Sequence, residues 1–158
     1  MTMPATAPKR LQIIDRVIAV LKTITNGTDY FYTPYDVAKR FCHWTEPNGY
    51  PYYMVFAGSG GKIENNTGVY EEDWYITIKG YVKDDLDTTT IMERCLRDIR
   101  KAINADMESG VAGSLAALNA VVLFEEPAQT DDGYLSAEGF GFFDQKVHVN
   151  TRALYEET

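Results

Sequence analysis

The segment Ala57-Gly58-Ser59-Gly60-Gly61 carries the most enzyme-like pattern in the chain. It follows an apolar stretch and resembles a nucleophile elbow, in which a strained strand-to-helix turn exposes a serine hydroxyl. With His148 as its base, Ser59 would make the chain a small serine hydrolase. The next residues, 62–68, indicate a turn and another strand instead of a helix. A hairpin loop is therefore the favoured interpretation of this segment.

The two cysteines and two histidines are scattered singly and do not have the spacing of a zinc site. Cys42 and His43 are adjacent, and adjacent side chains on a strand point to opposite faces, so they would not form a thiolate–imidazole pair. We expect a buried Cys42 and an exposed His43. The aspartates of 84–87 lack the glycine and closing glutamate of a calcium loop, and a helix start explains them. We expect no catalytic residue, metal or cofactor.

Two segments have apolar side chains at the three- and four-residue spacing of a helix that packs on a core. The first covers residues 11–24 and the second residues 90–104. In the second, the apolar stripe consists of Met92, Cys95, Leu96, Ile99 and Ile103. We expect its charged residues, among them Arg94, Arg97 and Asp98, on the exposed side.

Alternating apolar and polar side chains, rich in β-branched and aromatic residues, predict strands over 52–57, 70–82, 119–126 and 140–151. Residues 33–44 fit either a short helix or a strand, and we favour the strand. The polar, glycine-rich residues 58–68 lack periodicity and are interpreted as a mobile hairpin tip. This order of elements predicts an α+β fold: a mostly antiparallel β-sheet with two main α-helices packed on it and a long β-hairpin.

The chain of 158 residues fits one domain, for which we expect flexible ends at 1–8 and 153–158. Its net charge of -8 disfavours a protein that coats nucleic acid, because such proteins carry a basic excess. No apolar stretch approaches the ~18 residues of a membrane span, so we expect no membrane partner. Tyrosine suits interfaces as well as cores, and nine of the 11 tyrosines cluster in or beside the early strands, between residues 30 and 81.

With these elements in place, the chain resembles the tail terminator (minor tail, tail-completion) proteins of long-tailed bacteriophages over about residues 11–152. The resemblance lies in the order of the predicted elements and in the types of residue that each contains. Its parts are the opening amphipathic helix, Tyr35-Asp36-Val37 before Tyr50-Pro51, the strand 52–56, the glycine- and asparagine-rich tip, the strand 75–82, the helix with Leu96-Arg97-Asp98-Ile99, and the pair 121–126 and 140–151.

The resemblance implies a structural virion protein without enzymatic activity. Its subunits would form a homohexameric ring that caps the tail tube, ends tube polymerisation and joins the tail to the head connector. The partners would be other copies of the chain, the tail tube protein and the connector or neck protein, in the virion and, during assembly, in the host cytoplasm. DNA would pass through without specific binding, and we expect an acidic lumen that repels phosphates. Another head-tail joining or neck protein is the alternative within this class.

Three groups of residues are candidates for contacts between subunits or with the tube. The hairpin tip offers a polar group, the second helix offers a basic patch, and the strand 70–82 offers tyrosines. These candidates are Gly58, Lys62, Asn65 and Asn66; Arg94 and Arg97; and Tyr75 and Tyr81. We also expect buried tyrosine and phenylalanine contacts to dominate the stability of the ring, because exposed ion pairs contribute only about 0–1 kcal/mol each.

Overall fold

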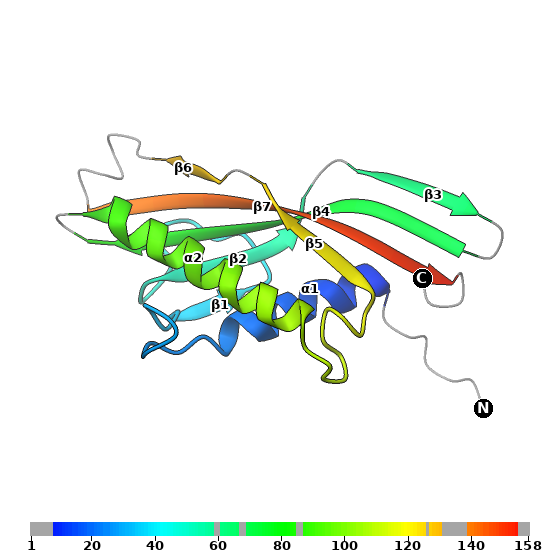
Figure 1. Cartoon of the computed structure of the whole chain (residues 1–158). Helices are drawn as coiled ribbons and strands as arrows, with labels where there is room; N and C mark the ends of the chain where they lie inside the picture. Colours follow the sequence, from blue (N-terminus) through cyan, green and yellow to red (C-terminus); the bar gives the residue numbers. More distant parts are fainter. Residues whose placement is uncertain are drawn as a thin grey trace, which may run out of the picture.

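The computed structural model describes residues 8–58, 61–66, 69–84, 87–125, 127–130 and 139–154. Its elements are α1 (Lys9–Lys22), β1 (Asp36–Ala38), β2 (Tyr52–Ala57), β3 (Lys62–Asn66), β4 (Val69–Lys83), α2 (Thr88–Met107), β5 (Ala120–Phe124), β6 (Ala128–Thr130) and β7 (Phe140–Leu154). The seven strands form one sheet of order β1-β2-β4-β7-β5, in which β3 also pairs with β4 and β6 with β7. Among the described strands, only β1 and β2 pair in parallel. The predicted α+β class is confirmed (Figure 1).

The strands β4 and β7 form the spine of the sheet. Each has 15 residues, and they pair without interruption from Val69 with Leu154 to Lys83 with Phe140. Side chains of alternate residues point to opposite faces, so those of Trp74 and its even-numbered neighbours are buried against the helices. Glycine is required at position 80, opposite Phe143, because a Cβ there would lie 2.1 Å from the Phe143 ring.

Both helices lie on one face of the sheet (Figure 1). The predicted apolar stripes are confirmed, because all five stripe residues of α2 and the apolar residues Ile13, Val17 and Leu21 of α1 are buried. The helix α2 begins earlier than expected, at Thr88, because the Asp87 carboxylate caps it by accepting a hydrogen bond from the Thr90 N–H at 3.0 Å.

The opposite face of the sheet, called the outer face below, is covered only in part by described residues. Residues 39–51 fold over the end formed by β2 and the C-terminal half of β4, where Cys42, Met54 and Tyr81 form a second buried cluster. The expected strand over 33–44 is reduced to the three residues of β1, since the rest of this segment forms the cover. Cys42 is buried and His43 exposed, as predicted.

The segment 58–68 was expected to be a mobile hairpin tip without regular structure, and this is wrong for residues 62–66, while residues 59, 60, 67 and 68 lie outside the described part of the chain. Residues Lys62–Asn66 form β3, which pairs with Val69–Asp73 of β4. The ends of the chain also differ from the prediction: Pro8 is the N-cap residue of α1, and Ala153 and Leu154 belong to β7. Residues 1–7 and 155–158 lie outside the described part of the chain.

Candidate assembly interface

The strand β5 forms an open and apolar edge of the sheet. Its sequence Ala-Val-Val-Leu-Phe alternates, with Ala120 and Val122 buried under the helix layer and the side chains of Val121 and Leu123 on the outer face. These two side chains are 57% and 60% exposed, and among the described residues no strand lies on the other side of β5. Edge strands of monomeric proteins are usually protected by charge, proline or a cover, and β5 has neither charge nor proline.

A polar cluster lies beside this edge on the outer face. Asp73 of β4 accepts a hydrogen bond from the Asn150 amide at 2.7 Å and lies 3.3 Å from His148 Nε2. The hydrogen bond from Asn150 holds the pKa of Asp73 below its ordinary value. Tyr75, a predicted contact residue, is half-buried here, with the Lys146 ammonium 4.0 Å from its ring centroid. Aromatic and polar side chains next to exposed aliphatic ones are typical of protein interfaces.

Tyr81, the other tyrosine predicted as a contact, is in a different environment. It is buried beneath residues 39–51, and its hydroxyl donates a hydrogen bond to the Cys42 carbonyl at 2.9 Å. Burial raises the pKa of Tyr81 to about 12. Within this subunit Tyr81 is therefore a core residue, and its expected role as an exposed contact is wrong because the sequence did not reveal the covering segment.

The four candidates in the hairpin lie along the opposite edge of the sheet. Ala57 opposes Ile76 and Lys62 opposes Asp73, and between these two pairs Gly58 lies against Tyr75 and Gly61 against Asp73 and Trp74. Gly58 donates its N–H to the Tyr75 carbonyl at 2.8 Å. Gly61 has φ +97°, and a Cβ there would lie 2.1 Å from the Asp73 carbonyl oxygen.

In β3, Lys62 is exposed and its ammonium lies 2.9 Å from Glu64 Oε1. Asn65 and Asn66 pair through their backbones with Tyr70 and Val69. Three of the four hairpin candidates, Lys62, Asn65 and Asn66, therefore belong to the edge strand β3, whereas Gly58 lies just after β2.

The basic candidates Arg94 and Arg97 hold part of their own chain. Their guanidinium carbons lie 5.1 and 5.2 Å from the ring centroid of Phe31, a distance typical of cation–π contacts. Arg97 also donates a hydrogen bond to the Asp29 carbonyl at 2.6 Å. Both arginines remain exposed, but both also contact the loop between α1 and β1.

Asp98 was expected on the exposed side of α2 and is instead fully buried. Its carboxylate accepts hydrogen bonds from the backbone N–H groups of Phe31, at 2.9 Å, and Tyr32, at 3.1 Å. The α1–β1 loop thus supplies the partners that make burial of this carboxylate possible. No pattern in the sequence reveals this contact, because it joins residues that are 66 and 67 positions apart.

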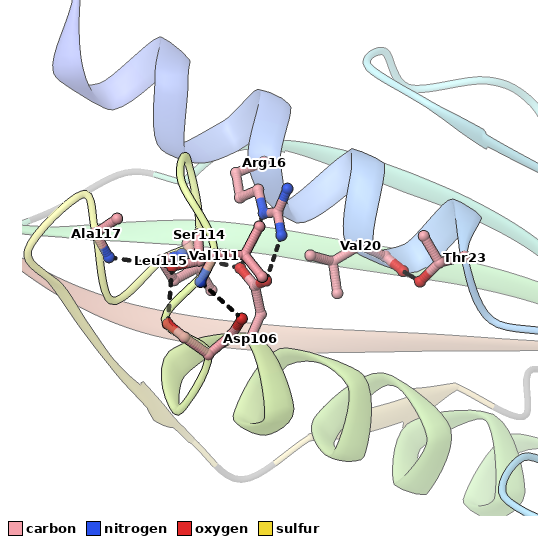
Figure 2. Close-up of polar contacts among 9 residues, drawn as sticks. Arg16, Val20, Thr23, Asp106, Val111, Ser114, Leu115 and Ala117 are labelled. Atoms are coloured by element: carbon pink, nitrogen blue, oxygen red, sulfur yellow. Dashed lines mark hydrogen bonds and ion pairs between the residues drawn. The ribbon is translucent and has the colours of Figure 1, made fainter.

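A hollow of about 280 Å³ separates α1 from α2, and Figure 2 shows its polar end. There Arg16 of α1 donates two hydrogen bonds to the nearly buried Asp106 of α2, one of them from Nε at 3.0 Å. Asp106 also accepts the Leu115 N–H at 2.9 Å. Burial by itself raises the pKa of Asp106, but the hydrogen bonds from Arg16 and Leu115 outweigh it and hold the pKa below its ordinary value. This group fixes both helices and the loop before β5 together.

The residues considered for catalysis or metal binding are not brought together in the described part of the chain. Cys42 and Cys95 are buried and burial raises the pKa of both thiols, to about 12 for Cys95, which disfavours the reactive thiolate. Ser59 lies outside the described residues, so its relation to His148 is not defined. Among the described residues, no group of three His, Cys, Asp or Glu is placed to hold a metal ion. None of the described helices is long and apolar enough to cross a membrane.

Comparison of the sequence with protein-family models and with curated proteins gives no match. The candidate interface therefore depends on geometry. Its most informative residues, Val121 and Leu123, were predicted as part of a strand but not as an exposed edge. A usable signal was present: the five uncharged residues 120–124 do not protect an edge, although Glu125 and Glu126 follow them, whereas β3 itself carries a lysine and a glutamate.

Proposed function

We propose that this protein is a phage tail terminator: a structural virion protein whose copies form a ring that caps the tail tube, ends its polymerisation and joins the tail to the head connector. The observation that carries the proposal is the open, apolar edge strand β5 with its exposed Val121 and Leu123. A subunit that must bind another copy needs such a surface, whereas a monomer gains nothing from it. The sequence resemblance supplies the biological setting, and the net charge of -8 suits a ring through which DNA passes unbound.

A closed ring requires head-to-tail contacts between two different surfaces of each subunit. The fold offers two such surfaces, because β5 and β3 lie at opposite edges of one sheet. The first test is the mass of the purified chain by light scattering across concentration and salt, followed by electron microscopy. The proposal predicts a discrete multiple of 17.8 kDa, expected to be six, seen as rings. A monomer at every concentration tested would contradict it.

A neck protein other than the terminator would also form rings, so a second experiment separates the two roles. Deletion of the gene from the phage is expected to give overlong tails if the chain is the terminator. Filled heads that leak DNA, with tails of normal length, would instead identify a head-completion protein.

A small serine hydrolase is the candidate from another class. It is favoured by the pairing of His148 with Asp73, since a carboxylate can orient a catalytic imidazole. An esterase assay on the wild type and on Ser59→Ala decides the matter. Equal and negligible rates for the two proteins would exclude the hydrolase function. A wild-type esterase activity that Ser59→Ala abolishes would support the hydrolase and contradict the structural proposal.

A further inference from the structure

The two open edges of the sheet match one another in length and overlap in part along the strand direction. The strands β5 and β3 each have five residues. One row crosses the sheet from Lys62 through Asp73 and Asn150 to Val121, and the next joins Ile63 to Ala120, so the two edges overlap over these two rows with only β4 and β7 between them.

The directions of these strands also match. Each neighbour in the series β3-β4-β7-β5 is antiparallel to the next, so β3 runs antiparallel to β5. A second copy, placed beside the first by rotation about an axis that follows the strands, would present its β3 antiparallel to β5 of the first. Antiparallel strands form the stronger ladder and need no change in either subunit.

The backbone of β5 has hydrogen-bonding groups available at this edge. The Glu125 N–H donates to the Lys146 carbonyl at 3.1 Å, and this pair continues the register between β5 and β7. Because hydrogen-bonded pairs alternate along an antiparallel ladder, Val121 and Leu123 also bond to β7, which leaves the N–H and C=O groups of Val122 and Phe124 directed to the open edge. The edge therefore offers donors and acceptors between its two exposed aliphatic side chains.

The side chains of β3 suit this edge. Ile63 is 55% exposed, and Lys62 and Glu64 already pair with each other on the outer face, at 2.9 Å. The lysine stem can cover an aliphatic neighbour while its ammonium stays in water. No charge on β5 opposes them.

We propose that β5 of one subunit adds to β3 of the next, so that the sheets of neighbouring copies continue into one another head to tail. The partner is a second copy of this chain. This inference rests on the proposed ring and names the contact that builds it. Pairing of β5 with β5 is the competing arrangement, but it would join two copies and leave both β3 edges open.

Cysteine cross-linking tests the contact, since both natural cysteines are buried. Leu123 and Glu64 lie on the outer face of their strands and are exposed, and opposed residues of an antiparallel pair come within disulfide range. A mixture of Val121→Cys with Lys62→Cys, which share one row, should form disulfide-linked dimers under mild oxidation. Mixtures of Leu123→Cys with Lys62→Cys or with Glu64→Cys test the registers shifted by two or four residues. The chain that carries both cysteines of the pair that cross-links should give a ladder up to the full ring. The control is Val111→Cys in the loop between α2 and β5, because Val111 is as exposed as Leu123, at 60%.

Two results would overturn the inference. One is a mixture that cross-links no more than the Val111→Cys control. The other is Leu123→Cys alone forming dimers as readily as the mixture, which would assign β5 to a two-fold contact. Light scattering distinguishes failure of the proposed contact from failure of the proposed function. A ring that forms without these cross-links contradicts only the contact between β5 and β3, whereas a monomer contradicts the ring itself.

Discussion

Removal of the apolar surface on β5 is expected to weaken self-association without unfolding the subunit. The double variant Val121→Ser/Leu123→Ser deletes two side chains that are 57% and 60% exposed in the isolated chain. Complete burial of such a side chain contributes about 1.5–3 kcal/mol, so covering the exposed three fifths of both contributes about 2–3.5 kcal/mol per contact. At 1.4 kcal/mol for each factor of ten, the Kd of the contact should rise about 30- to 300-fold.

Sedimentation equilibrium measures this change directly, over a concentration range that brackets dissociation of the wild-type ring. Val111→Ser is the matched control, because its side chain is 60% exposed and lies in a loop outside the proposed contact. Thermal unfolding of all three proteins as separated subunits should agree within about 0.5 kcal/mol, as expected for exposed positions. A double variant that associates as tightly as the control would refute the role of β5.

Three further predictions concern buried or conformationally restricted residues of the subunit. Asp106→Asn should reduce the free energy of unfolding by about 2–3 kcal/mol and Tm by about 5–10 °C, because it leaves a guanidinium that is only 28% exposed without its carboxylate. Asp15→Asn, in an exposed pair with Lys39, should cost less than about 1 kcal/mol, and equal Tm losses would contradict this reasoning. Gly61→Ala should cost about 2 kcal/mol or more through its positive φ and the Asp73 carbonyl, whereas Gly27→Ala, with open space around it, should change urea unfolding by less than about 0.5 kcal/mol. Tyr81 keeps its proton to about pH 12 in the folded protein but ionises near pH 10 when unfolded, so wild-type stability should fall as pH rises through this window. Tyr81→Phe should reduce that fall, and parallel pH profiles by denaturant unfolding would argue against burial of the hydroxyl.

Local sequence patterns predicted most helices and strands of this fold. Contacts between residues far apart in the sequence account for the differences between prediction and structure. The strand 52–57 and the apolar stripes of both helices follow from periodicity alone, because each reflects one buried face. Burial of Asp98 and of Tyr81 depends on segments far away in the sequence, which cover them only in the folded chain. The strand β3 is polar and glycine-flanked, and pairing with β4 determines its conformation more than its own side chains do.

The candidate interface could also be predicted only in part, because it depends on how distant strands are ordered in the sheet. Alternation predicted that Val121 and Leu123 share one face of a strand, but only the order of strands in the sheet places that strand at an edge. The predicted contacts at Lys62 and Tyr75 lie on exposed or half-exposed surface, and those at Arg94 and Arg97 also bind the α1–β1 loop.

The most direct test of the central claim is the length of tail tubes assembled from purified tube subunits of the same phage, measured by electron microscopy with and without this protein. The account predicts that the wild-type chain ends tube growth and leaves a ring at the tube end, and that Val121→Ser/Leu123→Ser at the same concentration lets growth continue. Tubes that grow to the same length whether or not the wild-type protein is present would contradict it.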